Sequence, residues 1–245
     1  MRIDSEPSAA GKPIQAMSFR AYNHHNFDQI EQLQLLTEEQ QFAIRAVAQV
    51  LPFRVNKYVI DNLIQWDAVP DDPIFRLVFP QPEMLEPEHF DRIASLLRSG
   101  AEEATVRQAA QQIHQELNPH PAGQTTLNVP KIGNEFLDGA QHKYRETLLF
   151  FPSHGQTCHS YCTFCFRWAQ FVGNNDLRIS SREVATLHEY LQMHHEITDL
   201  LVTGGDPMVM KTSRLQEYLQ PLTAPELEHL RTCLLYTSPS PRDRG

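Results

Sequence analysis

Three cysteines fall close together in the segment Cys158-His-Ser-Tyr-Cys162-Thr-Phe-Cys165. Thiolates at this C-x3-C-x2-C spacing can each bind a different iron of a four-iron, four-sulfur cluster, which leaves the fourth iron without a protein ligand. This fourth iron can then bind a small molecule. Only one further cysteine, Cys233, occurs in the 245 residues, so the grouping indicates a metal site and not a scatter of buried thiols.

A structural zinc site is the alternative for the same cysteines. Zinc in such sites takes four ligands, so His154 or His159 would have to join the three thiolates. The spacing alone does not distinguish a zinc ion from a cluster, and both interpretations stay open at this point.

A second motif, Thr203-Gly204-Gly205-Asp206-Pro207, follows a run of apolar residues. Glycines in such a turn let the backbone approach a ligand closely, and the Asp206 carboxylate can meet a cationic amino group. A tight strand-to-helix connection would use the same residue types. The turn therefore gains weight only if the fold places it beside the cysteines.

Two short apolar segments must position these motifs. Residues 147–151 and 197–203 each have the pattern of a strand buried on both faces, and helices are expected after each of them, one capped by Ser180 and Glu183 and the other over 213–219. This alternation predicts an α/β fold with parallel pairing and right-handed crossovers. Loops at the carboxyl ends of parallel strands share one edge, so we expect both motifs there.

The first half of the chain is predicted to be mainly helical. Thr37 and Gln40 form a capping-box pattern that opens one helix, and a shorter helix is expected within residues 55–66. Two further helices are expected, one from Pro87 to Gly100 and one around residues 106–117.

These patterns divide the chain into four parts: a loose amino-terminal arm at 1–30, a helical region at 31–126, a core with two strand-helix units at 127–232, and a tail at 233–245.

The tail reads CLLYTSPSPRDRG, and we expect it to form no helix or strand. The string resembles the translation of a sequencing-library adapter, so we expect the natural reading frame to stop being represented near Thr232. An ordinary Ser/Pro-rich tail is the alternative on composition. If later strands are missing, the second predicted strand is left with an unpaired, apolar edge.

Composition excludes several classes of protein. A formal net charge of -9 without a basic stripe argues against a general nucleic-acid binder. No run of about 18 apolar residues predicts a membrane span, and residues 1–13 lack the apolar stretch of a secretory signal. We therefore expect a cytoplasmic protein, in which reduced thiols favour metal binding over a disulfide.

Residues 129–222 resemble the radical S-adenosylmethionine (SAM) superfamily, and most closely its lysine 2,3-aminomutase-like group. The residues that carry the resemblance are 139–145, the three cysteines, Phe166-Arg167 and 204–207. It implies a helical amino-terminal region followed by the start of a partial (β/α)6 barrel, of which two strand-helix units are present. It also implies a 4Fe-4S cluster whose unique iron is chelated by SAM, reductive cleavage to a 5′-deoxyadenosyl radical, and hydrogen abstraction from an amino acid that undergoes 1,2-amino migration.

The resemblance also assigns roles to individual residues. Cys158, Cys162 and Cys165 hold the cluster, Phe164 lies against the adenine of SAM, and the turn of Gly204, Gly205, Asp206 and Pro207 binds SAM, with Gly204 to Asp206 at its methionine amino group.

Two further roles concern the substrate and a second cofactor. Arg167 pairs with the substrate carboxylate, for which a bidentate guanidinium is well suited, the alternative being a solvated surface arginine. Tyr144, with Lys143, falls in the region that meets pyridoxal 5′-phosphate, where the family more often has arginine than lysine.

One departure affects the choice of chemistry. The aminomutases attach pyridoxal phosphate through a lysine far downstream, which none of the five lysines here matches. A radical SAM enzyme without pyridoxal chemistry therefore stays open beside an aminomutase, and a non-catalytic zinc module is the third alternative. The implied partners are a small-molecule substrate and an electron donor such as flavodoxin or ferredoxin, with no nucleic acid and no membrane; a homo-oligomer is left open.

Overall fold

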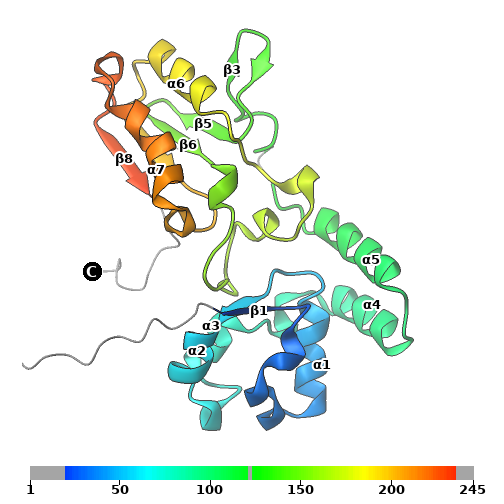
Figure 1. Cartoon of the computed structure of the whole chain (residues 1–245). Helices are drawn as coiled ribbons and strands as arrows, with labels where there is room; N and C mark the ends of the chain where they lie inside the picture. The colour runs from blue at the N-terminus through cyan, green and yellow to red at the C-terminus, as the bar shows by residue number, and fades with distance from the viewer. Residues whose placement is uncertain (1–19, 121–122, 236–245) are drawn as a thin grey trace, which may run out of the picture.

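A computed structural model describes residues 20–120 and 123–235 of the chain. In Figure 1 the helices of the first half gather at one end of the molecule and a sheet forms the other end. The helices of the first half are α1 Glu38–Val47, α2 Lys57–Asn62, α3 Pro73–Val78, α4 Pro87–Arg98 and α5 Glu103–Glu116. A short antiparallel pair, β1 Ala21–Asn23 with β2 Arg54–Asn56, joins them.

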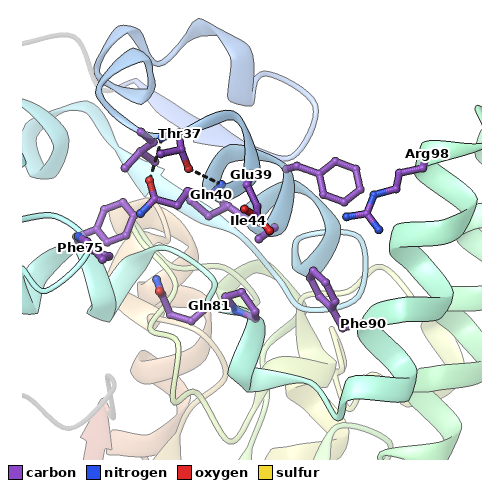
Figure 2. A pocket seen from close by; sticks show the side chains of 13 residues that line it. Thr37, Glu39, Gln40, Ile44, Phe75, Gln81, Phe90 and Arg98 are labelled. Atoms are coloured by element: carbon purple, nitrogen blue, oxygen red, sulfur yellow. Dashed lines mark hydrogen bonds between the residues drawn. The ribbon is translucent and has the colours of Figure 1, made fainter.

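The capping box of α1 is confirmed. The Gln40 backbone N–H donates to Thr37 Oγ1 at 3.2 Å, and the Thr37 N–H donates to Gln40 Oε1 at 2.9 Å, as Figure 2 shows. These bonds satisfy amide groups that have no partner within a helix at its first turn. The predicted helices at Pro87 and around 106–117 are also confirmed, as α4 and α5, whereas only Lys57–Asn62 of the segment 55–66 is helical.

The loose arm expected at 1–30 is wrong for its described part. Residues 1–19 lie outside the described residues, but Tyr22, Phe27 and Ile30 are buried in the core of the helical region. The isolated apolar residues in this polar segment gave no periodic signal. They become ordered because each one fills the core that the later helices form.

The second half contains a sheet of four strands in the order β5-β6-β7-β8. The bounds are β5 Ala140–Tyr144, β6 Thr147–Phe150, β7 Asp199–Val202 and β8 Thr232–Leu235, with a small hairpin of β3 Lys131–Ile132 and β4 Glu135–Phe136 beside them. Helices α6 Val184–Met193 and α7 Thr212–Leu219 follow β6 and β7 (Figure 1). The pairs β6–β7 and β7–β8 are parallel, which confirms the predicted pairing and the α/β class.

The strands are not buried on both faces, contrary to our expectation. Leu148 and Phe150 of β6 are fully buried, but Leu149 between them is only partly covered, and Leu200, Leu201 and Val202 of β7 repeat this alternation. The reason is that side chains of α6 and α7 pack against one face only. The continuous apolar run concealed a period of two.

The tail expected to lack regular structure begins with a strand. In β8, Cys233 lies opposite Leu200 and Leu234 lies opposite Leu201, so the outer edge of β7 is paired. Both the expectation of no strand within 233–245 and that of an unpaired β7 edge are therefore wrong. A free strand edge accepts main-chain hydrogen bonds from any extended apolar segment that reaches it, so this pairing does not depend on where the tail sequence comes from.

The helix α6 is also capped differently from the prediction. Ser180 and Glu183 form no capping box; instead the Glu183 N–H donates to Ser181 Oγ at 2.9 Å. Ser181 is buried because its main chain forms a bridge to Pro152, just after β6. Within the described ranges, no helix combines the length and apolarity needed to cross a membrane.

Candidate functional site

The two predicted motifs meet at the carboxyl edge of the sheet. The cysteine segment follows β6, and the Gly-Gly-Asp-Pro turn follows β7. Two main-chain hydrogen bonds join them, from Gly205 N to Gly155 O at 3.1 Å and from Asp206 N to Thr157 O at 2.7 Å. The expectation that both loops share one edge is confirmed, because the parallel pairing of β6 with β7 aligns their ends.

The glycines of the turn are required by this contact between loops. A Cβ atom on Gly205 would lie 2.1 Å from Thr157 O, and one on Gly204 would lie 2.2 Å from Gln156 Nε2. Gly204 also has a φ of +142°, which side-chain-bearing residues rarely adopt. We expected these glycines to let a ligand approach; their immediate role is to let the segment before Cys158 approach.

The three cysteines are partly buried in one loop and influence each other electrostatically. Burial raises the pKa of Cys158 to about 12, and the neighbouring Cys165, Asp206 and Cys162 add to the rise while Arg167 opposes it. Burial likewise raises the pKa of Cys162 and of Cys165. Thiols placed in this way stay protonated near neutral pH unless a positive charge stabilises the thiolates.

A metal centre supplies such a charge, since a coordinating thiol is deprotonated outright. Three thiols from one loop therefore fit an iron-sulfur cluster in which one iron has no protein ligand. No three His, Cys, Asp or Glu side chains in the described ranges are spaced to hold a single metal ion. In a cluster, each thiolate binds its own iron and the thiols need not converge on one point.

The histidines of the zinc alternative lie on either side of Cys158 in the same segment. His154 Nδ1 is 3.2 Å from the Tyr218 hydroxyl, on α7. His159 is exposed.

Arg167 links the two motifs. Its Nη1 donates to Gly204 O at 3.2 Å, and its guanidinium lies 4.8 Å from the centre of the Phe166 ring. Against the larger effect of burial, the positive charge of Arg167 lowers the pKa of Cys158, and a hydrogen bond from the Arg167 backbone together with this charge lowers the pKa of Cys165. Arg167 is therefore in reach of both the cysteine loop and the turn.

The other predicted SAM-binding residues lie in the same loops. Phe164 is 62% exposed beside Cys165, so its ring is accessible to a ligand. Asp206 Oδ1 accepts from Met208 N at 2.8 Å, which caps the short 3-10 helix Pro207–Val209, and Pro207 is buried. The Asp206 carboxylate thus orders the turn as well as contributing negative charge next to Cys158.

Tyr144 is not brought to this site. It pairs with Thr147 at the start of β6, whereas the cysteines follow the end of β6. Tyr144 and Lys143, whose Nζ lies 5.6 Å from the Tyr144 ring centre, are therefore at the opposite edge of the sheet. The prediction that Tyr144 and Lys143 meet pyridoxal phosphate stays a prediction; the antiparallel pairing of residues 140–144 with β6, which the polar residues of this segment did not indicate, places both away from the cysteines.

Two polar residues beside the turn were missed. Gln156 Oε1 and Thr203 Oγ1 are buried without a hydrogen-bond partner, although Gln156 Nε2 donates to Pro152 O at 3.0 Å. Both lie next to Gly204, so two buried polar atoms beside the turn have no hydrogen-bond partner among the described residues. The only sequence signal was their position next to the motifs.

Several pockets occur in the described chain. One of about 410 Å³, between α1 and α4 and lined by Phe42, Phe90 and Arg98 among others, contains none of the predicted site residues (Figure 2). Another, of about 630 Å³, is lined by Arg54 and Phe53 of the helical region together with Tyr161 of the cysteine loop.

Comparison with known proteins gives a consistent result. A protein named "Putative L-lysine 2,3-aminomutase" from Aquifex aeolicus (strain VF5) is 31% identical over 196 residues, which are 80% of this chain and 41% of that protein. L-lysine 2,3-aminomutase of Haemophilus influenzae is 34% identical over 91 residues, 37% of this chain and 26% of the relative. That of Escherichia coli (strain K12) is 33% identical over 98 residues, 38% of this chain and 26% of the relative.

The chain spans about two fifths of the length of the Aquifex relative and about a quarter of the other two. No protein-family model matches it. Similarity to the first relative covers most of the chain, and the shorter matches carry the same name. The chain therefore belongs to the lysine 2,3-aminomutase-like family.

Proposed function

We propose that this chain forms part of a radical SAM enzyme, with a 4Fe-4S cluster held by Cys158, Cys162 and Cys165. The names of the relatives support the family, and the partly buried thiols beside a glycine turn support the site. When bound, the cluster would supply the electron for reductive cleavage of SAM, and hydrogen abstraction from the substrate would follow.

We further propose that the sheet is the start of a (β/α)6 barrel. Helices α6 and α7 cover the face formed by Leu148, Phe150 and Leu200. The partly covered face of Leu149 and Leu201 would then point to the barrel interior. In barrels of this kind the carboxyl ends of the strands carry the active site, which is where both motifs lie.

Each site residue has a role that its position supports. The Gly204 to Asp206 turn would bind the methionine amino group of SAM through main-chain oxygens and the Asp206 carboxylate, with Pro207 fixing the end of the turn. The exposed ring of Phe164 would stack on the adenine. Arg167 would bind the carboxylate of an amino-acid substrate, since a guanidinium suits a carboxylate and the bond from Arg167 to Gly204 O holds it beside the turn.

The chemistry proposed for the whole protein is a 1,2-amino migration on an amino acid, as the names of the relatives suggest. In the described part of the chain, Tyr144 and Lys143 lie away from the cysteines, so pyridoxal phosphate is proposed only for the family chemistry, and no residue is assigned to hold it. We propose a cytoplasmic protein that takes electrons from a flavodoxin or ferredoxin.

The single observation that carries this proposal is the contact between the cysteine loop and the turn, made by Asp206 N and Thr157 O. The test is anaerobic reconstitution with iron and sulfide, followed by addition of SAM and dithionite and measurement of 5′-deoxyadenosine. Cys162→Ala is expected to lose both the visible absorption of the cluster and the product. Cys233→Ala, which removes the cysteine outside the loop, is the matched control and should keep both.

Two results would overturn the proposal. One is a purified protein that binds a single zinc ion and shows no iron-sulfur absorption. The other is a Cys162→Ala variant that forms 5′-deoxyadenosine as well as the unaltered chain does.

A further inference from the structure

The first spacer of the cysteine motif, residues 159–161, is hydrogen-bonded to the helical region. Asn56 donates to Ser160 Oγ twice, from its backbone N at 3.1 Å and from Nδ2 at 3.0 Å. The next residue, Tyr161, donates its backbone N–H to Arg54 O at 2.8 Å. In Figure 1 the loop after β6 reaches down to β1 and its neighbours, in agreement with these bonds.

The second spacer, residues 163–164, is held by a different element of the same region. Thr163 donates its backbone N–H to Leu77 O and its hydroxyl to Arg76 O, both at 2.8 Å. These carbonyls lie in the last turn of α3, where a helix leaves its carbonyl groups without partners. Thr163 therefore completes the end of that helix.

The partners in the helical region are themselves fixed. Asn56 ends β2 and also caps α2, because its Oδ1 accepts from Val59 N at 3.0 Å. Val55 and Phe79, next to the two contact points, are fully buried in one core cluster. The spacers are thus attached to residues of regular elements that border a buried core.

We propose that the helical region is part of the cluster-binding machinery and that Ser160 and Thr163 are positioning residues that preset the separation of the three thiols. This inference rests on the proposed function. Each spacer carries one anchored hydroxyl residue, so Cys158, Cys162 and Cys165 lie between fixed points. Ligands that are ordered before binding lose less conformational entropy when the cluster assembles.

The alternative is that these hydrogen bonds only join the cysteine loop to the helical region and do not position the thiols. In that case their removal would lower thermal stability and affect all cysteines alike. If they position the thiols, their removal acts on the loop cysteines, while Cys233 in β8 is unaffected and serves as a reference within the same molecule.

The test uses variants that change only the hydroxyls. Thr163→Val keeps the branched shape and removes the bond to Arg76 O, whereas Thr163→Ser keeps the hydroxyl; Ser160→Ala removes the acceptor of both Asn56 bonds. Thr223→Val is the remote control, since Thr223 Oγ1 donates to Gln220 O at 2.8 Å in the same kind of bond.

Two quantities are measured on each variant of the full chain. The first, on metal-free protein, is the alkylation rate of each loop cysteine by iodoacetamide relative to Cys233, determined by mass spectrometry. The second, on reconstituted protein, is the rate at which EDTA removes the cluster. Loss of a group that supports a metal ligand costs about 10–100-fold in metal affinity. We therefore expect Thr163→Val and Ser160→Ala to lose the cluster at least about tenfold faster.

The same two variants should show faster alkylation of the loop cysteines, while Thr163→Ser and Thr223→Val match the unaltered chain. Unchanged alkylation and cluster loss in Thr163→Val and Ser160→Ala would overturn the proposal, and so would an equal acceleration at Cys233. If the unaltered chain assembles no cluster, the proposed function fails, but the alkylation rates still decide whether these hydroxyls position the thiols.

Discussion

Adding one methyl group at Gly205 should separate the two loops of the candidate site. The new Cβ would lie 2.1 Å from Thr157 O and 2.4 Å from the Thr157 carbonyl carbon. Both are backbone atoms, so no side-chain rotation relieves the overlap. Because non-bonded atoms prefer separations near 3.5 Å, the loops must move apart by about 1.4 Å. This movement stretches the bond from Asp206 N to Thr157 O, now 2.7 Å long.

The cost of Gly205→Ala follows from these contacts. Overpacking a well-packed site costs about 1–3 kcal/mol, and weakening a main-chain hydrogen bond costs about 1 kcal/mol more. The expected loss is about 2–4 kcal/mol in the free energy of unfolding. For a chain of this size each kcal/mol corresponds to about 2–4 °C, so the melting temperature should fall by about 4–16 °C.

Thermal unfolding followed by circular dichroism measures this change, with Gly155→Ala as the matched control. Gly155 lies in the facing loop and accepts the bond from Gly205, but a Cβ there would be 3.4 Å from Pro152 Cγ, an ordinary contact. The free energy of unfolding of Gly155→Ala should change by no more than about 1 kcal/mol. Its melting temperature should therefore change by no more than about 2–4 °C. Equal melting temperatures for the two variants would refute the conclusion that contact between the loops requires Gly205.

Two further predictions concern the sheet and its helices. Leu148→Ala should destabilise the chain by about 2–5 kcal/mol, because Leu148 is fully buried, and Leu149→Ala should cost less than half as much; equal losses in urea denaturation would show that both faces are buried. Burial raises the pKa of Tyr190 to about 12, and Glu196 adds to the rise, so the folded state favours the neutral phenol. The stabilisation that the neutral Tyr190 phenol gives the folded state is fully present below about pH 10, the ordinary tyrosine pKa, and is lost as the pH rises towards 12. The Tyr190→Phe variant has no phenol to ionise, so its stability should not fall for this reason. Unfolding measured from pH 9 to 12 checks it, and identical slopes for the two proteins would contradict it.

Much of the sheet was predictable because its information is local. The apolar segments that form β6 and β7 stand out from their surroundings, and the helix between them leaves parallel pairing as the simplest connection. Strand β5 was not predictable in the same way. Its residues Gln141, His142 and Lys143 are polar, and the segment becomes a strand only because it pairs with β6.

The candidate site shows the same division. The cysteine spacing and the glycine turn are local patterns, and their adjacency follows from parallel strands. The contacts of Ser160 and Thr163 join residues 104 and 87 positions apart, and their partners include main-chain carbonyls that any sequence provides. No pattern of residue types records such a contact, so the sequence could not reveal that the helical region touches the cysteine loop.

The cysteine motif is therefore only one of three parts that define this site. The segment before Cys158 is fixed by the turn after β7, and the two spacers are fixed by β2 and the end of α3. A segment with the same cysteines but without residues 54–77 would keep every thiol and lose the anchors of both spacers. Because burial raises the pKa of the thiols, the proposed cluster would have to offset the cost of their ionisation, and a loop that is already ordered leaves more of the binding free energy for doing so. The helical region thus contributes to the chemistry of the cysteines although it supplies none of them.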